Sequence, residues 1–168
     1  MSKKLETVTN IAIVTVAIIA SAVLVKNYLL SKPRREPPPQ IGVGERLALP
    51  GVDWAGYGNT LVLALSPGCD SCSESAPFYR RLKTDLPNER VHFTAITPAT
   101  AEDGREYLRN LQVDVADVRQ VSLRELNIRG TPTLLLVDEQ GVVRNVWLGH
   151  FSPEKEQEVI DTIRAAIS

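Results

Sequence analysis

The sequence is poor in the residues that usually hold metal ions. Its 168 residues include two cysteines and two histidines. Two cysteines cannot supply the four ligands of a structural zinc site, and His92 and His150 lack the close spacing of zinc-finger histidines. With no third cysteine, the thiol chemistry of the chain is restricted to one dithiol or disulfide, formed by Cys69 and Cys72.

A basic excess is also missing from most of the chain. Residues 1–36 carry six Lys/Arg and two Glu, whereas residues 37–168 carry 13 Lys/Arg and 18 Asp/Glu. Nucleic-acid-binding domains normally present a basic surface to the phosphates. We therefore expect no nucleic acid partner for the acidic part. The basic residues at positions 26–35 are expected to contact lipid head groups.

One long uncharged segment is present, at residues 7–25. A helix of this length rises about 28 Å, which suffices to cross the hydrocarbon core of a bilayer. We predict a single-pass membrane anchor within residues 1–30 and a Pro-rich basic linker at 31–40. A cleaved signal peptide is the alternative, because residues 20–22 (Ala-Ser-Ala) fit the cleavage pattern. The apolar run continues beyond that site, which favours a retained anchor, and the flanking Lys and Arg lean towards a cytoplasmic C-terminal domain.

From residue 41 onward, alternating strand and helix patterns predict an α/β domain that reaches residue 168. Apolar runs predict central strands at 61–65 and 91–96, and an antiparallel hairpin at 133–137 and 142–148. The remaining predicted elements are a helix from Cys69 to Leu86 kinked at Pro77, helices over 100–111 and 122–126, a short strand at 113–115, and a final helix that begins at Pro153.

The cysteines stand together as Cys69-Asp70-Ser71-Cys72, after a predicted strand and at the start of a predicted helix. Both sulfurs then lie on the first helical turn, where free N–H groups favour a thiolate on Cys69. A purely structural disulfide is a weaker interpretation, because so short a loop removes little entropy from the unfolded chain. The pair predicts a reversible redox site in which Cys69 attacks and Cys72 resolves.

Asp70 places a carboxylate beside the attacking cysteine. A like charge at this distance should raise the pKa of the Cys69 thiol and give a reducing pair. Alternatively, Asp70 is an acidic residue that the start of a helix favours for its dipole.

The strand, the Cys-x-x-Cys pair and a helix with Pro77 five residues after the second cysteine resemble the thioredoxin fold. Residues 128–136, Ile-Arg-Gly-Thr-Pro-Thr-Leu-Leu-Leu, are similar to the segment that carries the cis-proline of that fold. Gly149 stands where thioredoxins keep a glycine after the last strand. With the anchor, the spacer and an extra helix, the chain most resembles the bacterial membrane-anchored TlpA/ResA-like thiol-disulfide oxidoreductases.

This resemblance implies a thioredoxin-like fold, in which a central mixed β-sheet is flanked by helices. Pro132 would face the cysteines in cis, with an ordinary trans turn as the alternative, and Thr131, Gly130 and Gly149 would border the bound substrate strand. The expected activity is the reduction of protein disulfides, as in cytochrome c or metal-site assembly. No cofactor is expected beyond the Cys69–Cys72 disulfide, and a membrane-embedded or soluble thiol reductant is the expected partner. The resemblance places the domain outside the bacterial cytoplasmic membrane, facing the periplasm or the cell exterior.

The chain also departs from the family pattern. Gly68 stands before the first cysteine, where the family usually has Trp. Ser71 stands before the second cysteine, where the family usually has Pro. Leu63 stands where thioredoxins have a buried carboxylate. Ser75 stands where relatives in cytochrome c maturation often have Glu, with Glu74 before it. The residues predicted to modulate the site are Asp70, Ser71 and Glu74.

A copper-binding chaperone is the alternative function. Sulfur and imidazole suit copper, so Cys69, Cys72 and His150 are its candidate ligands. Copper chaperones of this fold usually have three residues between their cysteines, which favours the enzyme. A lone loop histidine such as His150 is more often solvated than catalytic.

Overall fold

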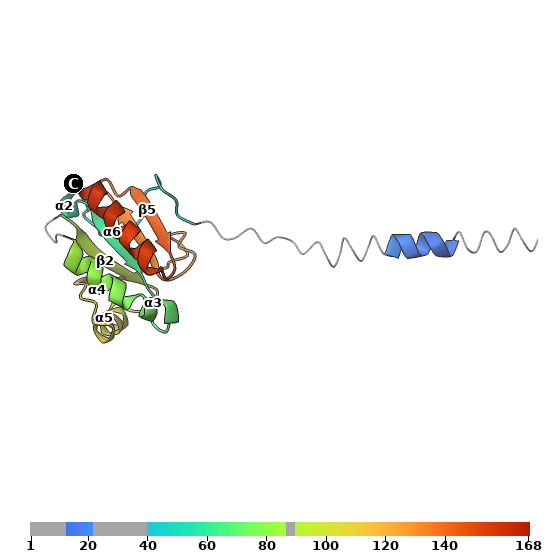
Figure 1. The fold of residues 1–168 in the computed structure, drawn as a ribbon, viewed down its shortest axis with the longest axis horizontal. Coiled ribbons are helices and arrows are strands. Elements are labelled where there is room, and N and C mark those ends of the chain that lie inside the picture. Colours follow the sequence, from blue (N-terminus) through green and yellow to red (C-terminus); the bar gives the residue numbers. More distant parts are fainter. Residues whose placement is uncertain (1–12, 22–39, 87–89) are drawn as a thin grey trace, which may run out of the picture. The chain divides into compact units, whose positions relative to one another are not determined.

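The computed structural model describes residues 13–21, 40–86 and 90–168 (Figure 1). The chain divides into two compact units, Met1–Pro37 and Pro38–Ser168. In the first unit, residues 13–21 are helical, and their large aliphatic side chains are exposed. Across the described residues, the structure contains no helix of the length and apolar character that a membrane crossing requires. The other parts of the predicted anchor, and nearly all of the predicted linker, lie outside the described residues.

The second unit is built on a five-stranded mixed sheet in the order β3-β2-β1-β4-β5. β1 pairs in parallel with β2 and antiparallel with β4, so it occupies the centre. Every residue of β1 and β4 is buried, because these strands are covered on both faces. The strands are β1 (Thr60–Ala64), β2 (His92–Thr97), β3 (Asp117–Gln120), β4 (Thr133–Val137) and β5 (Val143–Leu148). The strands predicted at 61–65 and 91–96 are therefore confirmed as β1 and β2, and the predicted hairpin is confirmed as β4 and β5.

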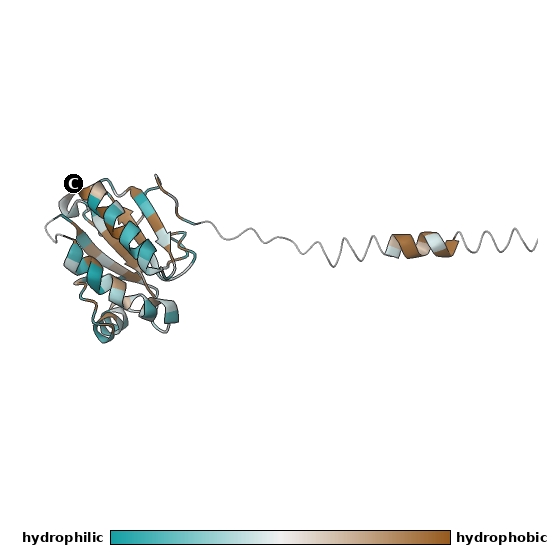
Figure 2. Ribbon diagram, in the orientation of Figure 1, coloured by the Kyte–Doolittle hydropathy of each residue, from teal (hydrophilic) through white to brown (hydrophobic). Residues whose placement is uncertain are grey.

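Three helices lie over one face of this sheet, with their polar residues outward (Figures 1 and 2). They are α4 (Ala76–Asp85), α5 (Ala101–Asn110) and α6 (Pro153–Ile167). Their apolar stripes pack on one set of alternating strand residues, among them Leu61 and Leu134. The opposite face is covered by residues 41–54 and 121–128 rather than by long helices.

Two further short helices are α2 (Trp54–Tyr57) and α3 (Asp70–Glu74). The sequence pattern did not predict α2. The predicted helices over 100–111 and from Pro153 are confirmed as α5 and α6, each with a hydroxyl side chain as its N-cap.

Three local predictions are wrong. The strand expected at 113–115 is a loop, because the amide of Val113 donates back to the carbonyl of Leu108, and β3 begins only at Asp117. Residues 122–126 form overlapping turns instead of a helix, since the amides of residues 125–128 donate to carbonyls three to five positions back without a regular helical pattern. The helix expected from Cys69 to Leu86 is two helices, broken at Ser75. Pro77 has no N–H to donate to a preceding turn, so it is tolerated in the first turn of a helix. It therefore lies in the first turn of α4, and the break at Ser75 precedes it by two residues.

α5 packs unusually close to the sheet because it carries a glycine at the contact. A Cβ atom on Gly104 would lie 2.8 Å from the Thr97 side chain and 3.0 Å from Val118. A larger residue would push the helix away from β2 and β3. This close approach fixes the position of Tyr107, one turn later on the same helix.

Candidate functional site

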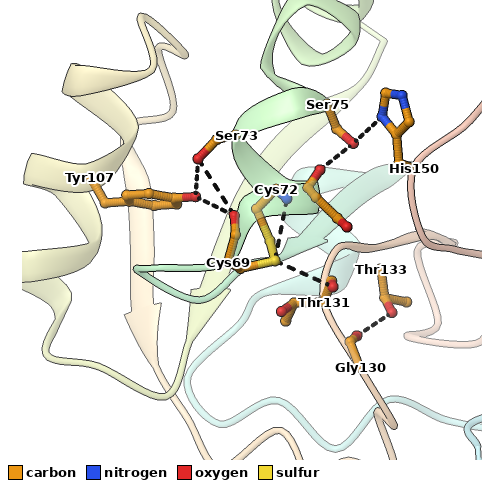
Figure 3. Close-up of a disulfide and its surroundings, with 10 residues drawn as sticks. Cys69, Cys72, Ser73, Ser75, Tyr107, Gly130, Thr131, Thr133 and His150 are labelled. Carbon is orange, nitrogen blue, oxygen red and sulfur yellow. Dashed lines mark hydrogen bonds between the residues drawn. A yellow bond between two sulfur atoms is a disulfide. The ribbon is translucent and has the colours of Figure 1, made fainter.

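The two cysteines lie just beyond the end of β1, at the start of α3 (Figure 3). Gly68 precedes them with φ at +78°, a conformation that side chains larger than glycine adopt only with strain. Cys69 is the N-cap of α3, and its Sγ accepts the Cys72 N–H at 3.2 Å. Cys69 and Cys72 form a disulfide. The local chain path therefore places both sulfurs on one helical turn, as the spacing predicts.

The two sulfurs differ in their access to solvent. Cys72 is completely buried, whereas Cys69 is half-buried at the edge of the core. A substrate sulfur can therefore approach Cys69 alone. Cys72 can reach only the sulfur of Cys69, which suits it to the second step of an exchange.

The loop before β4 faces this disulfide. The carbonyl oxygen of Thr131 lies 3.4 Å from Cys69 Sγ. The Thr131–Pro132 peptide bond is cis, and Pro132 is buried. The Thr133 hydroxyl donates to the Gly130 carbonyl at 2.7 Å, and the Gly149 amide donates to the Pro132 carbonyl at 2.8 Å. Of the four predicted residues, Thr131 contacts the disulfide, Pro132 follows it in the cis bond, and Gly130 and Gly149 are hydrogen-bonded to Thr133 and Pro132.

Backbone dipoles act on the Cys69 sulfur in opposite directions. The Cys72 N–H points a positive dipole at the sulfur and favours a thiolate there. The Thr131 carbonyl oxygen presents a negative dipole to the same atom and opposes the thiolate. Once reduced, the Cys69 thiol has this carbonyl within reach as an acceptor.

Tyr107 joins α5 to the site. Its hydroxyl donates to the Cys69 carbonyl at 3.3 Å and lies 3.2 Å from the Ser73 hydroxyl (Figure 3). Three groups from α3 and α5 therefore share one hydrogen-bonded cluster. The sequence pattern places Tyr107 on the apolar face of this helix. It therefore predicts a packing role for the ring and does not predict the hydrogen bond of its hydroxyl.

A second cluster lies on the other side of α3. The buried Ser75 hydroxyl donates to the Ser71 carbonyl at 2.7 Å and lies 3.0 Å from Nδ1 of His150. Burial raises the pKa of Tyr79, and a hydrogen bond with the Ser75 side chain partly offsets this rise. Sequence reasoning did not predict the Ser75–His150 pair, because the two residues are 75 positions apart.

The predicted modulating residues are arranged around α3. Asp70 and Glu74 are exposed, so solvent screens their charges. Ser71 contributes its backbone carbonyl to the Ser75 hydroxyl. Within residues 13–21, 40–86 and 90–168, no three His, Cys, Asp or Glu side chains are grouped closely enough to hold a metal ion. The three candidate copper ligands are thus not assembled, and the ring of His150 contacts Ser75.

Solved structures share this architecture. No protein-family model matches the sequence, and neither does any curated protein. A Chlorobium tepidum protein with the candidate assignment of thiol:disulfide interchange protein DsbE superposes with a TM-score of 0.61 at 19% identity, over 77% of this chain and 100% of that chain. The thioredoxin domain of a Bacteroides vulgatus thiol-disulfide oxidoreductase gives 0.61 at 14% identity, over 77% and 100%. A second Chlorobium tepidum thiol:disulfide interchange protein, of the thioredoxin family, gives 0.55 at 17% identity, over 79% and 98%.

The chain has a thioredoxin-like fold. This is the fold that the Cys-x-x-Cys pair and the Thr131–Pro132 segment led us to expect. At these identities, the likeness to solved structures establishes the fold alone.

Proposed function

We propose that the chain is a membrane-tethered thiol-disulfide oxidoreductase that reduces disulfides in extracytoplasmic proteins. One observation carries the proposal: a half-buried Cys69 sulfur lies beside the Thr131 backbone and is joined to a fully buried Cys72 on the same turn. A purely structural disulfide would not need one sulfur that solvent reaches and one sulfur that it does not. The thioredoxin-like fold supports the same activity.

The exchange follows from the geometry. The Cys69 thiolate attacks one sulfur of a substrate disulfide, and the other substrate sulfur leaves as a thiolate that takes up a proton. Cys72 then loses its proton and attacks Cys69 Sγ, which releases the second substrate sulfur and forms the Cys69–Cys72 disulfide. Two electrons pass to the substrate, and a thiol reductant must restore the dithiol. The cysteine pair is the only redox group that this cycle requires.

The direction of electron flow is proposed from the charges near Cys69. Asp70 adds a negative charge next to it, and the Thr131 carbonyl opposes a thiolate. Disfavouring the thiolate destabilises the reduced form, which makes the pair a better reductant. We expect a potential nearer about −270 mV, as in thioredoxin, than about −120 mV, as in a strong oxidant.

Tethering rests on the uncharged segment at 7–25 and on the exposed aliphatic residues of the helical stretch 13–21. We place the domain at the outer face of a bacterial cytoplasmic membrane, on the resemblance to anchored oxidoreductases. A membrane-impermeant thiol reagent should label reduced Cys69 in intact cells, once any outer membrane is permeabilised. Labelling that requires lysis would place the domain in the cytoplasm.

Trapping the mixed disulfide tests the activity itself. Cys72→Ala removes the resolving thiol, so this variant should retain protein substrates on Cys69 and release them with reductant. Cys69→Ala is the matched control and should retain none. Equal capture by the two variants would contradict the assigned order of attack. Equilibration with glutathione tests the direction, and a potential above about −180 mV would contradict the reductase.

A further inference from the structure

The Ser75–His150 contact places a titratable ring at the dithiol end of the sheet. The other histidine, His92, is the first residue of β2 and pairs with Thr60 at the opposite end of β1. Ser75 is 2% exposed and follows Cys72 by one helical turn. His150, in contrast, is exposed to solvent. His150 therefore links solvent to the turn that carries the buried thiol.

The contacts of Ser75 favour one tautomer of His150. The Ser71 carbonyl can only accept, so the single proton of the Ser75 hydroxyl is used at that 2.7 Å contact. The Ser75 oxygen must then accept from His150, which places a proton on Nδ1. The free lone pair is on Nε2. Protonation at Nε2 adds a positive charge while the contact with Ser75 stays intact.

The exposed ring of His150 reaches the buried Cys72 turn through the side chain of Ser75. Side chains one turn apart on a helix have Cβ atoms about 5–6 Å from each other, and both Cys72 and Ser75 are buried. The titratable groups on the elements next to this turn are Asp70, Glu74, Tyr79, Tyr107 and Glu156, the last of which is paired with Arg81. Among ordinary side chains, imidazole is the group that changes its charge between about pH 5.5 and 8.5.

We propose that His150 is a positioning residue whose positive charge speeds the attack of Cys72 on the mixed disulfide below neutral pH. This inference rests on the proposed oxidoreductase activity. In the step concerned, Cys72 gives its proton to solvent, its sulfur forms a bond to Cys69 Sγ, and the bond from Cys69 to the substrate sulfur breaks. The substrate leaves as a thiolate. An imidazolium beside the Cys72 turn stabilises the thiolate that must form.

Ellman's reagent, 5,5′-dithiobis(2-nitrobenzoate), measures this step directly in the 168-residue chain. An equimolar amount reacts with reduced Cys69 and releases one thionitrobenzoate, and the attack of Cys72 then releases a second one. We expect His150→Gln to slow the second phase about three- to tenfold at about pH 5.5 and to leave it unchanged at about pH 8.5. His150→Lys restores a charge that does not titrate in this interval, so it should match the wild type at the lower pH and exceed it at the higher one.

His92→Gln is the matched control and should follow the wild-type profile at both pH values. A His150→Gln profile that parallels the wild type, or an equal slowing at both pH values, overturns the role of His150 while leaving the oxidoreductase intact. Absence of any second phase in the wild type overturns the proposed activity, and this inference with it.

Discussion

The two ends of the sheet use polar groups in opposite ways. At the dithiol end, hydroxyls, a ring nitrogen and backbone carbonyls surround the sulfurs, and none of the ion pairs found among the described residues includes a residue of that cluster. Away from the dithiol, carboxylates are held by guanidinium groups: Asp138, in the turn at the other end, by Arg144 at 2.6 Å, and Asp117, opposite Thr94 within the sheet, by Arg119 at 2.9 Å. Fixed ion pairs suit turns that must stay in place. Neutral hydrogen bonds suit a site where a thiolate must appear and disappear.

The largest difference between the two ends should appear on removal of the attacking thiol. Cys69→Ser should reduce disulfide exchange to the uncatalysed rate, because a serine hydroxyl does not ionise near neutral pH. The free energy of unfolding of the reduced protein should change little. Stopped-flow exchange and urea unfolding measure the two quantities. Cys72→Ser, as the matched control, should keep the first attack and lose the second.

At the other end of the sheet, a substitution of Asp138 should reduce stability and leave the exchange rate unchanged. Asp138 Oδ1 accepts the amides of Gln140 and Val142, both at 2.9 Å, within the turn between β4 and β5. Asp138→Ala leaves these two amides without an acceptor and should lower the free energy of unfolding by about 1–3 kcal/mol. Asp138→Asn keeps an acceptor oxygen and should cost less. Urea unfolding tests the order of the two variants, and a change in exchange rate beyond that caused by unfolding would show that the two ends are coupled.

A smaller effect is expected from the contact between α5 and the site. Tyr107→Phe removes the hydroxyl that bonds the Cys69 carbonyl and should cost about 0.5–1.5 kcal/mol of stability. It should also change the exchange rate, because the Cys69 backbone loses a fixed partner. Ser73→Ala removes the exposed member of the cluster and should have less effect on both quantities. If the two variants behave alike, Tyr107 acts only through Ser73.

The smallest effect should come from the exposed charge beside Cys69. Asp70→Asn removes a like charge and favours the thiolate, so the reduced form gains stability and the potential should rise by about 10–20 mV. Equilibration with glutathione measures this shift. Glu74→Gln, at the other end of α3, is the control and should shift the potential less. A fall in potential on Asp70→Asn would show that Asp70 acts through the helix instead of on the sulfur.

Local sequence patterns predicted an element correctly where its apolar positions, or its capping residues, indicated its type and bounds without ambiguity. β1 and β4 are apolar at every position or nearly so, and this composition is stable only where both faces of a strand are covered. α6 has Ser152 as its cap, Pro153 at its first turn and a stripe of aliphatic residues, so its start and its buried face follow from sequence alone. The prediction for 113–115 was wrong because two buried valines in a loop resemble a short strand.

The sequence by itself determined the chemistry of the dithiol. The spacing of Cys69 and Cys72 restricts both sulfurs to one helical turn, and the Thr131–Pro132 segment indicates which fold surrounds them. These features are local, so they can be recognised without a structure.

Only the tertiary structure decided which groups surround the sulfurs. Tyr107 reaches Cys69 because Gly104 lets α5 approach the sheet closely, and His150 reaches Ser75 because β5 ends beside α3. These pairs are 38 and 75 residues apart in the chain. Nothing in their local sequence encodes the contact, because it depends on strand order and helix packing, which are properties of the folded chain as a whole.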